Sequence, residues 1–213
     1  DNLLSNELLF AQLVPQLVAR IHPGGVYLGV GPEQNFSYIA AVKPRFDFMT
    51  DIRRGKLRLQ LMYKALFELS TDRAEFVSRL FTKKRPQGLT STSSSRELMD
   101  AFWDAHSADE AAFRANLKAL TDGLIKDHSL PLPAEDLDGI ARAYRAFYWY
   151  GPQMNPGSNL SMALGAERGG GPTYRDVVTE VNASGQGVGF LGSEEQFAVV
   201  KGSPEAKSGC SCG

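Results

Sequence analysis

Cysteine is nearly absent from the sequence. Only Cys210 and Cys212 occur among 213 residues, and both lie near the C-terminus. Two thiols at this place exclude a disulfide framework, and they are too few for a zinc site built from four thiolates. The scarcity of cysteine therefore predicts a reducing, cytoplasmic compartment.

The chain also lacks a charge excess and a long apolar run. Its 23 basic and 24 acidic residues give a formal net charge of -1, so no overall field attracts nucleic acid or anionic lipid. No apolar run reaches the ~20 residues that a membrane-spanning helix needs, which predicts a protein without a membrane partner. Charged residues and Pro15 interrupt the N-terminal apolar positions, which excludes a signal peptide. The absence of an initiator methionine predicts a fragment or a processed product.

Histidine is scarce as well. His22, His106 and His128 are scattered along the chain without the spacing of metal ligands. We expect capping or surface roles for them and no metal site.

The apolar residues that are present, 43% of the chain, form recognisable patterns in residues 1–55. A helical stripe covers residues 3–20, with a kink expected at Pro15. The continuous apolar run Val26–Val30 predicts a strand covered on both faces, and Phe46–Thr50 predicts a second buried strand. A short helix over Phe36–Val42 separates them. This order predicts a Rossmann-like βαβ segment with a right-handed crossover.

The rest of the chain is predicted to be mainly helical. Residues 56–150 form a helical block, in which Asp72 with Glu75 and Ser94 with Glu97 match the capping box. Residues 151–172 read as a flexible Gly/Pro-rich loop, 173–201 as a short helix-strand-helix return with its strand at Gly187–Leu191, and 202–213 as a disordered tail. The expected fold class is α/β, with a Rossmann-like βαβ core, a small and incomplete parallel sheet and a large helical block.

The turn Gly29-Val30-Gly31 is the main candidate site. Glycines after a strand let a ligand approach the backbone, and an acid after the second strand can accept hydrogen bonds from ribose hydroxyls. Asp51 lies 22 residues after Gly29, at the offset expected for that acid. Gln34 replaces the third glycine of the dinucleotide pattern, and Glu33 repels a pyrophosphate, so a small ligand without phosphates is favoured.

Each of these residues has a structural alternative. The glycines can serve a tight turn alone, and Asp51 can cap the helix that follows it. Asn35 can be a helix cap or a ligand contact, and we place Tyr38 near the site. The basic run Arg53–Arg58 reads as a solvated helix flank or as a contact for RNA or phosphate. Because no aromatic residues interleave with these charges to stack bases, the flank is favoured over nucleic acid.

The turn resembles that of the class I S-adenosylmethionine-dependent methyltransferases. The resemblance implies that Gly29 and Gly31 lie against the methionine part of S-adenosylmethionine and that Asp51 binds its ribose. Tyr27 stands where that family usually carries an acid. Residues 1–200, with "YLGVGPEQNFSYIAA", "DIRR" and "SEEQF", also resemble a family of uncharacterised bacterial proteins. The resulting hypothesis is a methyltransferase-like, nucleoside-binding cradle, and the alternative is a noncatalytic small-molecule-binding or interaction module.

Overall fold

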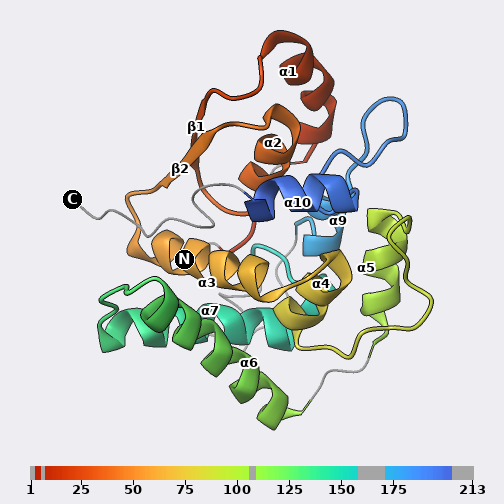
Figure 1. The fold of residues 1–213 in the computed structure, drawn as a ribbon. Coiled ribbons are helices and arrows are strands. Elements are labelled where there is room, and N and C mark those ends of the chain that lie inside the picture. Colours follow the sequence, from red (N-terminus) through yellow and green to blue (C-terminus); the bar gives the residue numbers. More distant parts are fainter. Residues whose placement is uncertain (1–2, 6–7, 106–108, 158–170, 203–213) are drawn as a thin grey trace.

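A two-stranded parallel sheet lies at one end of a molecule that is otherwise helical (Figure 1). The computed structural model describes residues 3–5, 8–105, 109–157 and 171–202. Strand β1 spans Val26–Val30 and strand β2 spans Phe46–Thr50, as the sequence predicts. Helix α2, Gln34–Val42, joins them and ends at Lys43, whose left-handed φ of 47° precedes Pro44. The βαβ order is therefore confirmed.

The remaining helices follow the predicted block closely. In chain order they are η1 Phe10–Gln12, α1 Val14–Arg20, α3 Arg54–Leu69, α4 Arg73–Phe81, α5 Ser95–Trp103, α6 Glu110–Asp122, the π-helical turn η2 Gly123–Asp127, α7 Ala134–Tyr150, η3 Gly151–Gln153, α9 Tyr174–Val178 and α10 Glu194–Gly202. Helix α3 packs along α7, and α10 packs on α2 and α3 (Figure 1). The chain is thus of mixed helix and strand content, with a large helical share.

Aromatic side chains fill the centre of the core between α2, α3, α4 and α10. Phe67 stacks on Phe76 with ring centroids 4.6 Å apart, and Phe36 meets Phe67 edge to face at 5.1 Å. Phe190 and Phe197, from the last part of the described chain, contact the same rings. These contacts fasten the βαβ segment to the helical block, so the two share one core.

Both strands are less covered than their sequences predict. The expectation of burial on both faces is wrong, because successive side chains of β1 and β2 alternate between the core and the solvent. Helix α2 packs against β1, whereas Val26, Leu28 and Val30 on the opposite face are exposed. A continuous apolar run indicates that both faces of a strand are apolar. It does not indicate whether a layer of helices covers the second face.

The N-terminal helix is shorter than predicted. Leu4 is fully buried in the core, and the amide of Ser5 donates to Glu33, so residues 3–5 are not helical. Leu9, with a left-handed φ of 70°, precedes η1. Tertiary contacts therefore override the helical stripe at residues 3–5.

The strand predicted at Gly187–Leu191 is also corrected. The structure has an isolated antiparallel bridge between Val181 and Gly187, and Phe190 enters the aromatic core. The amide of Phe190 donates to the hydroxyl of Ser37 in α2 instead of pairing in a sheet. Most of the predicted loop 151–172 and nearly all of the predicted tail 202–213 lie outside the described residues.

The predicted caps are confirmed with one difference. Ser94 and Glu97 form a capping box, whereas Asp72 caps α4 alone because the Glu75 carboxylate accepts from Thr71 instead. Among the described residues, no helix is long and apolar enough to cross a membrane.

Candidate functional site

The candidate site lies where β1 and β2 end. The strands are parallel, and Val30 pairs with Thr50, so Gly31 and Asp51 follow at the same edge of the sheet. The carboxyl edge of a parallel sheet is where α/β proteins place their ligands. The structure thus brings together the glycine turn and the acid that lie 20 or more positions apart in sequence. We call this place the carboxyl edge.

Gly31 is the open position of the turn. Its φ of 97° is one that residues with a side chain rarely adopt, and a Cβ built there would meet no atom within 4 Å. The side-chain amide of Gln60 in α3 donates to the Gly31 carbonyl at 2.9 Å, which fixes the turn from below. Backbone at Gly31 is therefore held in place while its outer side is open.

Gly29, in contrast, serves close packing inside the protein. A Cβ at this position would lie 2.5 Å from Oδ1 of Asn35, 2.8 Å from Sδ of Met49 and 2.8 Å from Cε1 of Tyr27. These distances explain the glycine without a ligand.

Replacing Gly29 with alanine is expected to lower the free energy of unfolding by about 1–3 kcal/mol, because three packed side chains must move. The matched control is Gly25→Ala, where a Cβ would meet nothing within 4 Å. That control should stay within about 0.5 kcal/mol of the wild type. Urea unfolding of both variants measures the difference, and equal stabilities would contradict the packing explanation.

Asn35 neither caps α2 nor faces an open site. Its Oδ1 accepts from the Tyr27 hydroxyl at 2.7 Å, and its Nδ2 donates to the carbonyls of Val30 and Pro32 at 3.0 Å each. The N-cap position of α2 is Glu33, which makes no side-chain cap. Asn35 therefore ties the end of β1 to the turn.

Glu33 points into the protein. Its side chain is fully buried, and the amide of Ser5 donates to Oε1 at 3.0 Å. Burial raises the pKa of Glu33 to about 7, although the Ser5 amide and the charge of Lys56 act against the increase. Glu33 is thus a titratable group closed off by the N-terminal segment, and it does not lie on the outside of the turn.

Tyr38 lies one turn into α2 on the same side. Its hydroxyl accepts from the side-chain amide of Gln34 at 2.9 Å, and the Ser5 hydroxyl donates to Gln34 Oε1 at 2.7 Å. The ring of Tyr38 meets Phe10 edge to face, with centroids 5.9 Å apart. Residues 3–5 therefore cover the start of α2, where a pyrophosphate would lie in a dinucleotide site.

Asp51 does not cap α3, because the N-cap position of that helix is Arg53 and it has no side-chain cap. Its Oδ1 accepts from the amide of Arg53 at 2.9 Å, which shapes the entry into α3, and its side chain is only 9% exposed. Lys56 lies near both acids of the site: burial lowers its pKa, and the charges of Glu33 and Asp51 act against that change. Lys56 thus interacts electrostatically with Asp51 at the carboxyl edge and with Glu33 in the core.

The basic run is therefore only partly a solvated flank. Lys56 and Arg58 are buried, and Arg58 donates from Nε to Asp136 in α7 at 2.9 Å. Arg54 pairs with the same carboxylate. Residues 54 and 58 are one helical turn apart, so their side chains lie on the same face of α3. This spacing is the sequence signal that could have predicted a shared partner.

No sequence pattern predicts a role for two tyrosines that lie near Glu33. Tyr63 and Tyr174 are fully buried, and neither hydroxyl has a hydrogen-bond partner of normal geometry among the described residues. Burial raises the pKa of both phenols, and the nearby Glu33 charge raises it further. No local motif identifies them, because α3 and α9 bring them together from positions more than a hundred residues apart.

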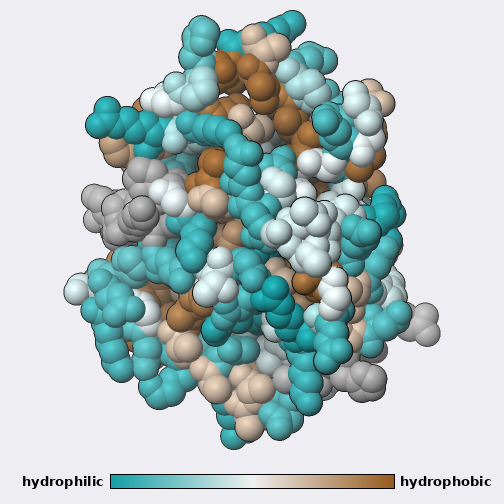
Figure 2. Space-filling view, turned by 45° about the vertical axis from the view of Figure 1, so that its right-hand side comes forward, coloured by the Kyte–Doolittle hydropathy of each residue, from teal (hydrophilic) through white to brown (hydrophobic). Residues whose placement is uncertain are grey.

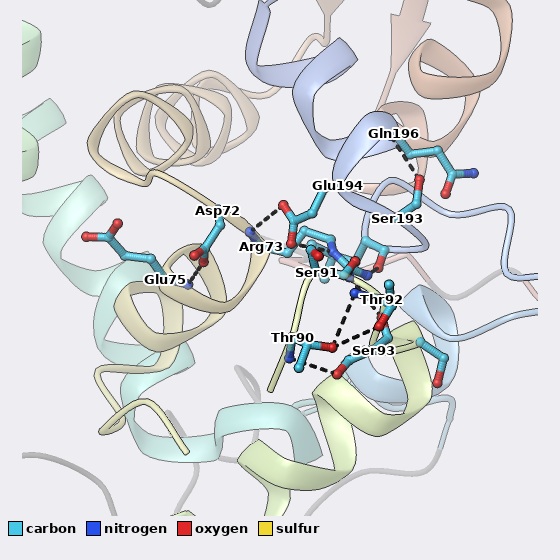
Figure 3. A network of polar contacts seen from close by, with 12 residues as sticks. Asp72, Arg73, Glu75, Thr90, Ser91, Thr92, Ser93, Ser193, Glu194 and Gln196 are labelled. Carbon is cyan, nitrogen blue, oxygen red and sulfur yellow. Dashed lines mark hydrogen bonds and ion pairs between the residues drawn. The ribbon is translucent and has the colours of Figure 1, made fainter. Parts of the chain in front are cut away.

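A second polar cluster lies around Arg73, at the start of α4 (Figure 3). The buried guanidinium pairs with Glu194 of α10 at 3.0 Å and donates to the backbone carbonyls of Leu191, Ser91 and Ser93. A hollow of about 160 Å³ beside it is lined partly by these residues and by Asp72 and Arg85. All donors of Arg73 that face the cluster are used within the protein, so we assign it a structural role.

The comparison with known protein families finds a match to a family whose function is not established. Residues 3–130 match the family described as "Domain of unknown function (DUF7790)", which covers more than half of the chain. The chain belongs to this family. A comparison with curated proteins finds no match.

Proposed function

We propose that the carboxyl edge is a Rossmann-type ligand site that binds a nucleoside-bearing small molecule, with S-adenosylmethionine as the first candidate. The observation that carries the proposal is the parallel register of the two strands. Because of it, the open backbone of Gly31 and the acid Asp51 both come directly after the ends of neighbouring strands. In this role Asp51 accepts hydrogen bonds from the ribose hydroxyls, and Gly31 leaves room for the ligand to approach.

The surroundings favour a ligand without phosphates. Ser5 and Gln34 cover the start of α2, so its amides are not offered to a pyrophosphate. Asp51 adds negative charge at the same edge, where Arg53 Nε lies 3.7 Å from its Oδ1. A neutral nucleoside, or the positively charged sulfonium of S-adenosylmethionine, suits this charge better than a dinucleotide does.

A methyltransferase is the enzyme class that such a site would serve. Methyl transfer to a nucleophile can proceed mainly by proximity and orientation, so it does not require a catalytic acid or base in the protein. We therefore assign binding roles to Gly31 and Asp51 and no catalytic residue. Glu33, Asn35 and Tyr38 support the turn from inside, and Gly29 allows it to pack.

Calorimetric titration with S-adenosylmethionine, S-adenosylhomocysteine and adenosine tests the proposal. We expect saturable binding that Asp51→Asn weakens at least tenfold, because the ribose hydroxyls lose a charged acceptor. Binding of adenosine alone would limit recognition to the nucleoside part.

The matched control is Asp109→Asn. Asp109 also accepts a backbone amide, that of Ala112 at 2.8 Å, but it lies at the start of α6. It should leave the affinity unchanged. Absence of binding heat for all three ligands at millimolar concentration would falsify the nucleoside site.

A noncatalytic interaction module is the second candidate, and one specific observation favours it. The sheet exposes a row of large apolar side chains that nothing in the described chain covers. This feature is independent of the carboxyl edge.

A further inference from the structure

One face of the sheet is apolar and open to solvent. Val26, Leu28 and Val30 of β1 are 62%, 73% and 70% exposed, and Phe46 and Phe48 of β2 are 42% and 47% exposed. The register pairs Val26 with Phe46 and Leu28 with Phe48, so all five side chains stand on one face. We call it the uncovered face.

The apolar surface continues beyond the strands. Ile52, two residues after β2, is fully exposed. Figure 2 shows exposed hydrophobic atoms in the upper part of the molecule, which holds α1, α2 and the strands, and further hydrophobic areas in its middle and lower part. Single exposed hydrophobic residues are ordinary on a protein surface, but a contiguous row of this kind marks an interaction site.

The outer edge of β1 is open too. Among the described residues, β1 pairs in the sheet only with β2, so alternate backbone amides and carbonyls on the outer edge of β1 lack a ladder partner. Parallel sheets normally have both faces covered and more than two strands. The surface therefore offers backbone hydrogen bonds and apolar area together.

Topology indicates which edge receives a new strand. Helix α2 lies on one face of the sheet, where it packs against β1. In doubly wound sheets, strands added beyond β1 carry their helices on the opposite face. The side chains of β1 are more exposed than those of β2, which puts the centre of the uncovered face on the β1 side.

We infer that the outer edge of β1 and the uncovered face together bind a polypeptide partner that adds a parallel β-strand to the sheet and packs an amphipathic helix across the face. Arginines flank the apolar row: Arg45 lies over the Phe46 ring at 5.3 Å, and Arg53 follows Ile52. The partner helix therefore carries acidic residues along the borders of its apolar stripe.

Two other occupants fit the surface less well. A lipid bilayer cannot supply the hydrogen bonds that the strand edge requires. A second copy packed face to face would bring the arginines at the ends of β2 against each other, and it would leave the edges unpaired. Both remain as outcomes of the experiment.

The experiment uses the full chain and a displayed library of strand-helix segments of about 40 residues, a length sufficient for such a unit. The library has an apolar strand, an apolar helix stripe and acidic borders, and it is selected on the wild-type protein. We expect selected segments to bind the wild type, and Leu28→Lys and Val30→Lys to weaken them at least tenfold. Hydrogen exchange at the β1 amides should slow when a segment binds.

The control is Val18→Lys on α1, where the side chain is also exposed, at 54%, but lies outside the sheet. It should bind as the wild type does. Because residues 28 and 30 point to solvent, their lysine variants should keep the wild-type melting temperature, and two variants guard against misfolding of either.

Three results would overturn the inference. One is a selection in which no segment distinguishes Leu28→Lys from the wild type. Another is sedimentation of the wild type as a dimer that Leu28→Lys dissociates, which would assign the face to a second copy. The third is binding to vesicles of phosphatidylcholine and phosphatidylglycerol that the same variant abolishes. None of these results depends on the nucleoside titration, so the two proposals fail separately.

Discussion

Replacing Arg73 with methionine is expected to lower the free energy of unfolding by about 2–4 kcal/mol, because a buried guanidinium that donates to Glu194 and to three backbone carbonyls is lost. The Arg73 side chain is only 2% exposed. It joins the start of α4 to three segments: the loop at Ser91 and Ser93, the carbonyl of Leu191, and Glu194 of α10 (Figure 3). Methionine fills a similar length but donates no hydrogen bond, so the buried Leu191 carbonyl and the partly buried acceptors of Ser91, Ser93 and Glu194 lose their partner.

Arg85→Met provides the matched control for Arg73. Arg85 also pairs with a carboxylate, Asp72 at 2.8 Å, but its side chain is 45% exposed. An exposed pair of this kind contributes less than about 1 kcal/mol. Urea unfolding with comparable m-values measures both variants. If Arg73→Met were no less stable than Arg85→Met, the polar cluster around Arg73 would not stabilise the fold as its geometry indicates.

Local patterns predict the helices of this chain well. The stripe of Leu59, Met62 and Leu66 forms the buried side of α3, and Ser94 with Glu97 caps α5 as expected. These features depend on residues three or four positions apart, which the sequence places together directly. The strand-helix-strand order is likewise local and is confirmed.

Features that depend on distant partners are not predicted. Ser5 meets Glu33 across 28 positions, and Arg58 meets Asp136 across 78. The composition of the basic run indicates solvent, yet helix α7 supplies carboxylates that let Arg58 be buried. The exposure of one face of β1 is not predicted for the same reason. An apolar side chain in the sequence does not indicate whether a second layer of the structure covers it.

The carboxyl edge contains one feature that the sequence predicts and one that it does not. Spacing alone predicts that Gly31 and Asp51 lie together, because parallel strands end at the same edge. Spacing cannot predict that Glu33 turns inward, since that depends on residues 3–5 reaching over α2. The turn is therefore the predicted one, while its two carboxylates have different surroundings: Asp51 is at the edge and Glu33 is in the core.

Glu33 makes the stability of the protein depend on pH in a particular direction. In the folded protein the pKa of this carboxyl is about 7, raised from 4.5 by burial, whereas the unfolded chain releases the proton near 4.5. Between these values the folded state binds more protons than the unfolded state, so the free energy of unfolding falls as pH rises. At 1.36 kcal/mol per pKa unit, the loss between pH 4.5 and 7 is about 3 kcal/mol. Above pH 7 this contribution is constant.

Other groups with shifted pKa values act in a different range. Glu75 and Asp136 have pKa values of about 2, Glu75 held there by hydrogen bonds from Thr71 and Arg79 that outweigh desolvation, and Asp136 by its hydrogen bond from Arg54. Their stabilisation is present above the unfolded-state pKa and is lost only as pH falls toward 2. They therefore do not contribute to the loss predicted between pH 5 and 7.

Glu33→Gln isolates the effect. Glutamine keeps an oxygen that can accept the Ser5 amide but cannot ionise, so the variant should lose the decline in stability between pH 5 and 7 and exceed the wild type at pH 8. Glu180→Gln is the control, because Glu180 also accepts amides of the N-terminal segment, those of Leu9 and Ala11, but is only half-buried. It should keep the wild-type profile. Urea unfolding from pH 5 to 8 compares the three proteins, and parallel profiles for Glu33→Gln and the wild type would show that the carboxylate is hydrated in solution. In that case residues 3–5 would not seal Glu33 from water.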